Sequence, residues 1–239
     1  MSSVFCCRPT YGNEALRGSR FFAGPSKHAL IAAGGVETNP TRARDFLGQT
    51  DLVLAADGGY RLLRLLSLDC HILVGDFDTL TETEVAQAER AGCRIVRFSA
   101  DKSKSDLEIA IDLAYQEGAT QVTLLGALGG EWDHCVANLL APLSLCADYG
   151  MWARLLTAEA QIYLVQGHVT VEAPDQRISL AALTKHVEDL TLRGMQYSLQ
   201  GTQLSRTQTL GLANRVVAEV ATVEFSSGEL LLTVMHKTR

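Results

Sequence analysis

The sequence lacks the usual signatures of proteins that bind phosphate through a single glycine loop. It contains neither G-x-x-x-x-G-K-[ST] nor G-x-G-x-x-G, so neither a P-loop nor a dinucleotide-binding fingerprint is present. Its six cysteines form no C-x-x-C, and its histidines form no H-x-x-x-H pair, which argues against a zinc site. Scattered cysteines are typical of a reducing compartment, so we expect mostly reduced thiols and a cytoplasmic protein.

A block of basic residues is absent too. The formal net charge is −6, whereas a nucleic acid or an anionic membrane surface is bound through clustered lysine and arginine. We therefore expect no nucleic-acid partner and no membrane partner. The first 27 residues contain no continuous apolar run, so we also expect no signal peptide and no membrane span. An acidic protein that handles a polyphosphate needs a metal ion between the two negative charges.

What the sequence does contain is a regular alternation of strands and helices. The pattern predicts strands at residues 29–33, 52–55, 94–98 and 121–125, and a further strand that starts at 72 and runs into Asp76 and Asp78. Helical patterns follow at 41–49, 60–68, 81–92 and 105–118, and beyond 130. Ser105 and Glu108 have the spacing of a capping box. Leucines 62, 65 and 66, and the apolar positions 136, 139, 140 and 143, predict core-facing helix stripes.

The alternation with short connections indicates an open parallel α/β sheet, Rossmann-like and doubly wound. From about residue 155, period-2 apolar runs take over, with a hairpin turn expected at 226–228. Such runs indicate an antiparallel β-sandwich. We therefore expect an irregular extension (1–27), an α/β domain (28–155) and a C-terminal β-sandwich domain (156–239).

Asp76 and Asp78 are the first candidate site. On an extended chain, residues i and i+2 face the same side about 6.5 Å apart, so the two carboxylates can meet at one cation while Phe77 packs the other way. Mg²⁺ suits such a site because it binds through one or two carboxylates plus substrate phosphates. The alternative is a solvated acidic turn at the end of a strand.

Polar or glycine residues follow each expected strand. They are Gly34-Gly35, Asp57-Gly58-Gly59, Asp76 with Asp78, Asp101 with Asp106, and the loop 126–130 with Asp133 and His134. Ligands in open parallel sheets bind beyond the carboxyl ends of the strands. Lys102 and Lys104 lie where they can reach a phosphate, and Gly129 and Gly130 precede a helix start, where backbone N–H groups bind phosphate.

Each piece also has a purely structural alternative. Asp57-Gly58-Gly59 fits a tight turn, and Asp106 fits the first turn of a helix, where the dipole favours an anion. Gly129-Gly130 fits a plain strand-to-helix loop. His134 fits a packed or an exposed side chain as well as a catalytic one.

Four motifs taken together resemble the thiamin pyrophosphokinase family. They are A-D-G-G (56–59), G-D-F-D-T (75–79), D-K-S-K-S-D (101–106) and G-A-L-G-G-E-W-D-H (126–134), in this order. The resemblance extends from about residue 28 to the C-terminus. It implies Mg²⁺-dependent transfer of pyrophosphate from ATP to the hydroxyethyl group of thiamin, giving thiamin diphosphate and AMP, by a homodimer whose sites are completed across the interface.

The resemblance also implies roles for individual residues. Asp76, Asp78 and Asp106 would be catalytic and hold the metal and the triphosphate. The residues implied in binding substrate or nucleotide are Asp57, Gly58, Lys102, Ser105, Gly129, Gly130, Asp133, His134 and Asn214, with Asn214 beside thiamin.

Three positions depart from the family pattern. Glu131 stands where the family usually has arginine, Ser103 replaces an acid, and Ala213 replaces a serine. Two other functions remain open. One is a diphosphokinase of the same architecture that acts on another hydroxymethyl compound, such as a pterin, and the other is a nucleotide- or thiamin-binding protein without turnover.

Overall fold

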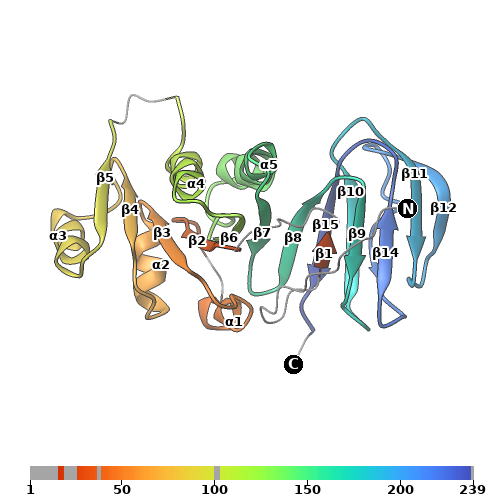
Figure 1. Ribbon diagram of the computed structural model, residues 1–239, viewed down its shortest axis with the longest axis horizontal. Coiled ribbons are helices and arrows are strands. Elements are labelled where there is room, and N and C mark those ends of the chain that lie inside the picture. Colours follow the sequence, from red (N-terminus) through yellow and green to blue (C-terminus); the bar gives the residue numbers. More distant parts are fainter. Residues whose placement is uncertain (1–15, 19–25, 37–38, 100–102, 238–239) are drawn as a thin grey trace.

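The computed structural model describes residues 16–18, 26–36, 39–99, 103–237 of the chain. Figure 1 shows a half in which helices lie on both faces of a sheet, and beside it a half built of strands. The helices are α1 (Pro40–Arg44), α2 (Gly59–Leu65), α3 (Glu82–Arg90), α4 (Asp106–Gln116) and α5 (Trp132–Asp148). None of the helices in these ranges has the length and apolar character needed to cross a bilayer.

The strands form two sheets. They are β1 (Leu16–Gly18), β2 (His28–Ala32), β3 (Leu52–Ala56), β4 (Ile72–Gly75), β5 (Arg94–Arg97), β6 (Gln121–Leu125), β7 (Trp152–Leu156), β8 (Ala160–Val165), β9 (His168–Val171), β10 (Arg177–Ala182), β11 (His186–Arg193), β12 (Leu199–Ser205), β13 (Asn214–Arg215), β14 (Ala221–Glu224) and β15 (Leu230–Met235). The larger sheet has the order β13-β10-β15-β8-β7-β6-β2-β3-β4-β5, and the smaller one β1-β9-β14-β11-β12.

The larger sheet is parallel from β5 to β7. Strand order reverses between β2 and β6, because β3, β4 and β5 lie to one side of β2 while β6 and β7 lie to the other. This is the doubly wound arrangement, in which ligands bind where the order reverses. The predicted fold class is confirmed: a mostly parallel α/β sheet is joined to a separate antiparallel sheet.

The central parallel strands β2, β3 and β4 are buried along their whole length, as their apolar runs require, whereas the edge strand β5 is partly exposed. Successive side chains of a strand point to opposite faces. Ile31 of β2 packs in the cluster that contains Ile111 of α4 and Leu143 of α5. Its neighbour Leu30 packs in the opposite cluster, which contains Leu63 of α2 and helices α1 and α3. The helices therefore cover both faces of the sheet, as Figure 1 shows.

Two helices begin with a full capping box. In α4 the predicted pair is confirmed: Ser105 accepts from the Glu108 N–H, and Glu108 accepts from Ser105. In α3, Thr81 and Glu84 form the same reciprocal pair. Each box satisfies N–H groups that a helix start leaves unpaired.

The C-terminal half is a sandwich of two sheets. One apolar core joins Val171 of β9 and Leu190 of β11 in the smaller sheet to Leu180 of β10 and Leu232 of β15 in the larger. The predicted hairpin at 226–228 is wrong. β14 and β15 belong to different sheets, so this segment crosses from one sheet to the other.

The larger sheet continues through the predicted domain boundary. β7 pairs with β6 in parallel and with β8 in antiparallel register, so the boundary at 155/156 falls inside β7. At the other boundary, β1 of the N-terminal stretch pairs with β9. The division into domains stays a prediction.

Two predicted core stripes are partly wrong. Leu65 on α2 is 69% exposed, and Val136 and Leu140 on α5 are 59% and 40% exposed. Trp132, one turn before Val136, is 83% exposed. On α5 these positions are spaced by four residues, so they form one apolar stripe along the outside of the helix.

A buried arginine joins the two halves. Arg154 of β7 is 2% exposed, and its guanidinium donates to four neutral acceptors. These are Thr123 Oγ1 (3.0 Å), Gln161 Oε1 (2.8 Å) and the carbonyl oxygens of Phe46 and Leu47 (2.9 Å each). The acceptors come from β6, from β8 and from the turn after α1, so one side chain ties three segments together.

We expect Arg154→Met to destabilise the protein strongly. The change leaves two buried carbonyl groups without a donor, and each such group costs about 1–3 kcal/mol. The free energy of unfolding in urea should fall by about 3 kcal/mol or more. Arg94→Met is the control, since Arg94 makes an exposed ion pair with Glu117; its effect should stay within about 0.5 kcal/mol. Equal losses in the two variants would contradict this role of Arg154.

Candidate active site

The loops after β2, β3 and β6 touch through glycine backbones. The Gly35 N–H donates to the Gly126 carbonyl at 2.7 Å, and a Cβ on Gly35 would lie 2.4 Å from that oxygen. A Cβ on Gly34 would lie 3.5 Å from the Cα of Gly58. Only glycine at position 35 permits this approach. The contact lies where the strand order reverses, the place where doubly wound folds bind ligands.

Three carboxylates meet beside these loops. Oxygen atoms of Asp57, Asp76 and Asp78 lie within 4.8 Å of one another. Asp57 follows β3 and Asp76 follows β4, two adjacent strands whose pairing reaches Ala56 and Val74. The sheet register therefore places the acids together at its carboxyl edge.

Asp57 is the buried member of the group. It is 8% exposed, and its Oδ1 is buried without a hydrogen-bond partner in the described part of the chain. Its backbone is in the left-handed region, with φ of 42°, and its N–H donates to the Val74 carbonyl at 2.8 Å. A buried carboxylate oxygen without a donor is costly unless a cation or ligand faces it.

Asp76 and Asp78 meet by a turn and not by the predicted extended strand. β4 ends at Gly75, and Phe77 takes a left-handed φ of 63°. The Asp78 N–H donates to Asp76 Oδ1 at 3.2 Å. The predicted strand therefore stops before the acids, and a tight turn replaces it. Phe77 is 6% exposed while Asp78 is exposed, in line with the predicted packing of Phe77 away from the acids.

Asp106 is not part of this group. It is the first residue of α4, and the group formed by the oxygens of Asp57, Asp76 and Asp78 does not include it. A second group, of Glu131, Asp133 and His134, lies at the exposed start of α5. The role predicted for Asp106 stays a prediction. Asp57, predicted as a lining residue, lies inside the cluster.

The basic loop before α4 is only partly described. Lys102 and Asp101 lie outside the described residues. Lys104 forms an ion pair with Asp112 at 2.5 Å, which raises the pKa of the lysine. The Ser105 hydroxyl is held in the capping box of α4, donating to Glu108 at 2.9 Å.

The glycine loop after β6 leads into exposed polar residues. Gly129 and Gly130 have left-handed φ values of 99° and 91°, and a Cβ on Gly130 would meet nothing within 4 Å. Asp133 and His134 are exposed in the first turn of α5. Glu131, the N-cap of α5, makes no capping hydrogen bond; its carboxylate lies 3.7 Å from His134 Nε2.

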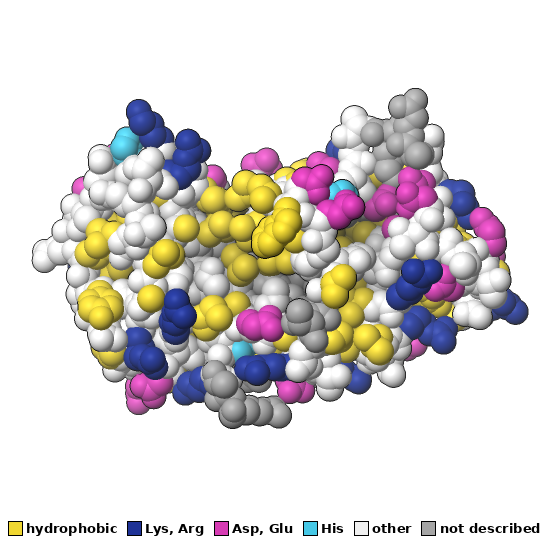
Figure 2. All heavy atoms as spheres, turned by 180° about the vertical axis from the view of Figure 1, so that it is seen from behind, with side chains coloured by type: hydrophobic (Ala, Val, Ile, Leu, Met, Phe, Trp, Pro, Cys, Tyr) yellow, Lys and Arg dark blue, Asp and Glu magenta, His cyan; other side chains and the backbone are white. Residues whose placement is uncertain are grey.

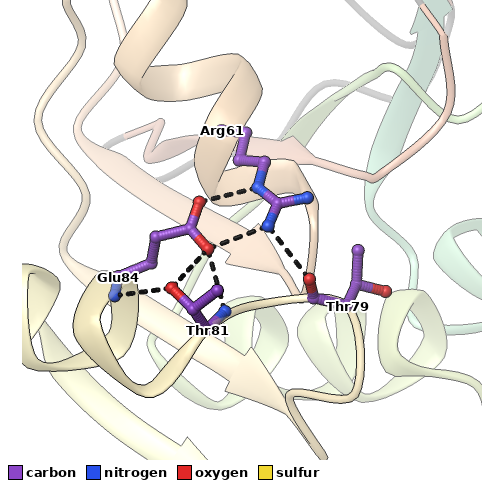
Figure 3. Close-up of polar contacts among 4 residues, drawn as sticks. All are labelled: Arg61, Thr79, Thr81 and Glu84. Atoms are coloured by element: carbon purple, nitrogen blue, oxygen red, sulfur yellow. Dashed lines mark hydrogen bonds and ion pairs between the residues drawn. The ribbon is translucent and has the colours of Figure 1, made fainter.

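A network that the sequence reasoning missed lies behind the acidic turn (Figure 3). Arg61 of α2 donates to both oxygens of Glu84, at 2.7 and 2.8 Å, and to the Thr79 carbonyl at 3.0 Å. These hydrogen bonds, with those from Thr81, lower the pKa of the Glu84 carboxyl to about 2. The T-x-x-E spacing of Thr81 and Glu84 is the signal that predicts their capping box. No local pattern predicts Arg61.

Two family profiles match the chain, and together they span most of it. Residues 43–153 match the profile described as thiamin pyrophosphokinase, catalytic domain. Residues 168–230 match the one described as thiamin pyrophosphokinase, vitamin B1 binding domain. The chain belongs to the thiamin pyrophosphokinase family. It is an enzyme of this type, a transferase that forms thiamin diphosphate.

Known members of the thiamin pyrophosphokinase family are similar along nearly their whole length. The thiamine pyrophosphokinase of Bacillus subtilis (strain 168) is 27% identical over 213 residues, which is 85% of this chain and 95% of that protein. A crystal structure of thiamine pyrophosphokinase from Bacillus subtilis has a TM-score of 0.78 at 23% identity, covering 89% of this chain and all of that one. The Geobacillus thermodenitrificans structure has a TM-score of 0.74 at 25% identity, covering 88% and 98%.

Asn214 lies in the segment that matches the vitamin B1 binding profile. It is 4% exposed. Its Oδ1 accepts from the N–H groups of Tyr197 (3.0 Å) and Arg215 (2.8 Å), and its Nδ2 donates to the Tyr197 carbonyl (2.7 Å). The amide therefore pins the turn at 195–198 to β13. Its predicted place beside thiamin stays a prediction.

The acidic cluster fits a divalent cation. Mg²⁺ is bound by oxygen ligands in an octahedral shell that includes water and substrate phosphates. Asp57 offers a buried oxygen without a donor, and Asp76 and Asp78 offer more exposed oxygens within 4.8 Å. This donor set is hard and anionic, as Mg²⁺ prefers.

Adjacent glycines give a matched test of the loop contact. We expect Gly35→Ala to lower the free energy of unfolding by about 1–3 kcal/mol or more, because its Cβ would overlap a backbone oxygen. Gly34→Ala should change it by no more than about 0.5 kcal/mol, since its Cβ meets atoms only at 3.5 Å and beyond. Urea unfolding of both variants measures this. Equal stability of the two variants would mean that the loops are not in close contact.

Proposed function

We propose that the chain transfers the pyrophosphoryl group of ATP to the hydroxyethyl group of thiamin, with AMP as the second product and Mg²⁺ bound at the acidic cluster. The observation that carries this proposal is the group of Asp57, Asp76 and Asp78, whose oxygens lie within 4.8 Å beside the glycine loops. A catalyst of this kind acts mainly by positioning and by stabilising charge. A cluster of carboxylates with a cation supplies both.

The three acids differ in exposure, and this supports different roles. Asp57, at 8% exposure, forms the floor of the site. Asp76 is half-buried and Asp78 is exposed, so Asp78 is open to a triphosphate. Magnesium, when bound, neutralises charge on the phosphoryl oxygens. Asp78 or Asp106 would accept the proton of the thiamin hydroxyl, although a loose transition state does not require a strong base.

The glycine loop and its flanking residues are proposed as the nucleotide side of the site. A helix start with glycines before it presents free backbone N–H groups to phosphate, and Gly130 faces open space. Gly58, Lys102, Ser105, Gly129, Asp133 and His134 complete this set, and Asn214 is proposed on the thiamin side.

The two halves of the chain are proposed to bind different ligands. We propose that residues 28–155 bind the nucleotide and the metal, and that 156–239 bind thiamin and take part in dimerisation. The matched ranges 43–153 and 168–230 support this division. A cytoplasmic location is part of the proposal, supported by the free thiols of Cys70, Cys93, Cys135 and Cys146.

The proposed reaction is tested by AMP release from ATP that requires both thiamin and Mg²⁺. We expect Asp78→Asn to lower turnover at least about 100-fold without lowering the urea midpoint of unfolding, because Asp78 is exposed at a turn and its removal relieves repulsion. Asp69→Asn is the control, since Asp69 is exposed before β4 at the opposite edge of the sheet; it should keep full activity.

Other outcomes of this assay point to other functions. AMP release with a hydroxymethyl pterin but not with thiamin would replace the substrate. Binding of thiamin and ATP without AMP release, at saturating Mg²⁺, would indicate a binding protein. Full turnover of Asp78→Asn would remove Asp78 from the metal site.

A homodimer is also proposed, and the apolar stripe on α5 supports it. Trp132, Val136 and Leu140 are exposed on one side of the helix, next to the glycine loop. Tyr197 and Val217 in the C-terminal half are each 60% exposed. Figure 2 shows hydrophobic side chains gathered where the two halves meet on the rear face. Such surfaces favour contact between copies, so that one copy's C-terminal half completes the other's site.

We expect Val136→Glu to dissociate this dimer, because it places a charge inside an apolar contact. Light scattering after gel filtration should give twice 25.9 kDa for the unchanged chain and 25.9 kDa for the variant. Leu65→Glu is the control, since Leu65 is 69% exposed outside the stripe. A Val136→Glu variant with the mass of a dimer would exclude this stripe as the interface.

A further inference from the structure

The acidic turn is anchored from behind by one guanidinium. Arg61 lies on α2 and Glu84 in the first turn of α3, and the turn that carries Asp76 and Asp78 lies between β4 and α3 (Figure 3). Arg61 Nε donates to Glu84 Oε1 at 2.7 Å, and its Nη2 donates to Glu84 Oε2 at 2.8 Å. A bidentate pair of this kind fixes direction as well as distance.

The same guanidinium reaches the backbone of the turn. Arg61 Nη2 donates to the Thr79 carbonyl at 3.0 Å. The Thr79 hydroxyl donates to Asp78 Oδ1 at 3.1 Å, and the Asp78 N–H donates to Asp76 Oδ1 at 3.2 Å. Thr79 and Asp78 therefore link Arg61 to the two more exposed acids through successive hydrogen bonds.

Arg61 is also close in sequence to the third acid, Asp57. It lies four residues after Asp57, in a helix that begins at Gly59. Holding Thr79 and Glu84 from α2 therefore fixes the loop after β4 against the loop after β3. Without a bound cation, repulsion among three carboxylates tends to open this arrangement, and the hydrogen bonds of Arg61 to Thr79 and Glu84 oppose it.

Glu84 secures the other end of the turn. Its Oε2 accepts from the N–H of Thr81 at 2.8 Å and from its hydroxyl at 2.9 Å. The side chains of Arg61 and Glu84 are 50% and 26% exposed. A surface pair this exposed adds little to global stability, so its effect should be local.

We propose that Arg61, oriented by Glu84, is a positioning residue that sets the affinity of the acidic cluster for a divalent cation. The inference rests on the proposed metal site and adds to it a residue that touches neither the cation nor substrate. Partners that orient metal ligands typically change metal affinity 10- to 100-fold when lost.

Mn²⁺ alone, without ATP or thiamin, is the probe. Free Mn²⁺ is counted by electron paramagnetic resonance during titration of the folded protein. Arg61→Met and Glu84→Gln should each weaken Mn²⁺ binding about 10-fold or more. Glutamine keeps the capping box, so Glu84→Gln removes the charge without unravelling α3. Arg61→Lys should restore less than full affinity, because lysine lacks the bidentate fork.

The double variant and a control separate positioning from other effects. Arg61→Met with Glu84→Gln should bind Mn²⁺ no more weakly than either single variant, because both remove one anchor. Arg94→Met, which breaks the exposed pair with Glu117, should bind Mn²⁺ like the unchanged chain. The urea midpoints of Arg61→Met and Arg94→Met should shift by similar small amounts.

Three results would overturn the inference. They are unchanged Mn²⁺ affinity in Arg61→Met, equal weakening in Arg94→Met, and additive losses in the double variant. A raised KM for ATP in Arg61→Met with normal Mn²⁺ binding would make Arg61 a direct phosphate ligand. If the unchanged chain binds no Mn²⁺, the metal site itself is refuted. If the unchanged chain releases AMP in a thiamin-dependent way and Arg61→Met binds Mn²⁺ as tightly as the unchanged chain, only the positioning role is refuted.

Discussion

Mutual repulsion among three carboxylates is the constraint on which the site depends. Oxygens of Asp57, Asp76 and Asp78 lie within 4.8 Å of one another, and like charges this close repel. Left-handed backbone at Asp57 and Phe77 adds a cost of about 1–3 kcal/mol each. This geometry is maintained because the buried strands β3 and β4 precede the two residues and fix where each loop begins.

The surrounding structure is arranged to keep that geometry. Arg97 stacks its guanidinium 4.7 Å from the centre of the Phe77 ring and donates to the Asp76 carbonyl at 3.3 Å. Arg61 holds the other side of the turn through Thr79. Both guanidinium groups therefore hold the backbone of the turn, and each also pairs with a glutamate, Arg61 with Glu84 and Arg97 with Glu82.

The sequence predicts the parallel half well because its signals are local. The runs 29–33 and 52–55 are apolar throughout, as strands buried on both faces must be, and the spacing of Ser105 and Glu108 predicts a helix start.

The predictions that failed depend on backbone geometry or on long-range contacts, which local patterns do not encode. The strand predicted through Asp78 ends at Gly75 because Phe77 takes a left-handed turn, and the 226–228 hairpin joins two sheets. Val136 looks like a core residue because periodicity marks an apolar face without saying what covers it. No local pattern predicts the role of Arg61, because its partners Thr79 and Glu84 lie 18 and 23 residues away in sequence.

The unbroken ladder from β6 through β7 to β8 has a mechanical consequence. Moving the C-terminal half toward the α/β half would break backbone hydrogen bonds and separate the Arg154 guanidinium from the carbonyls of Phe46 and Leu47. Hinge closure of the two halves, common in enzymes whose lobes are joined by a flexible linker, is therefore not expected in this chain. Exclusion of water from the reacting groups therefore depends on short loop movements or on a neighbouring subunit. The relative position of the two halves is fixed once the chain has folded.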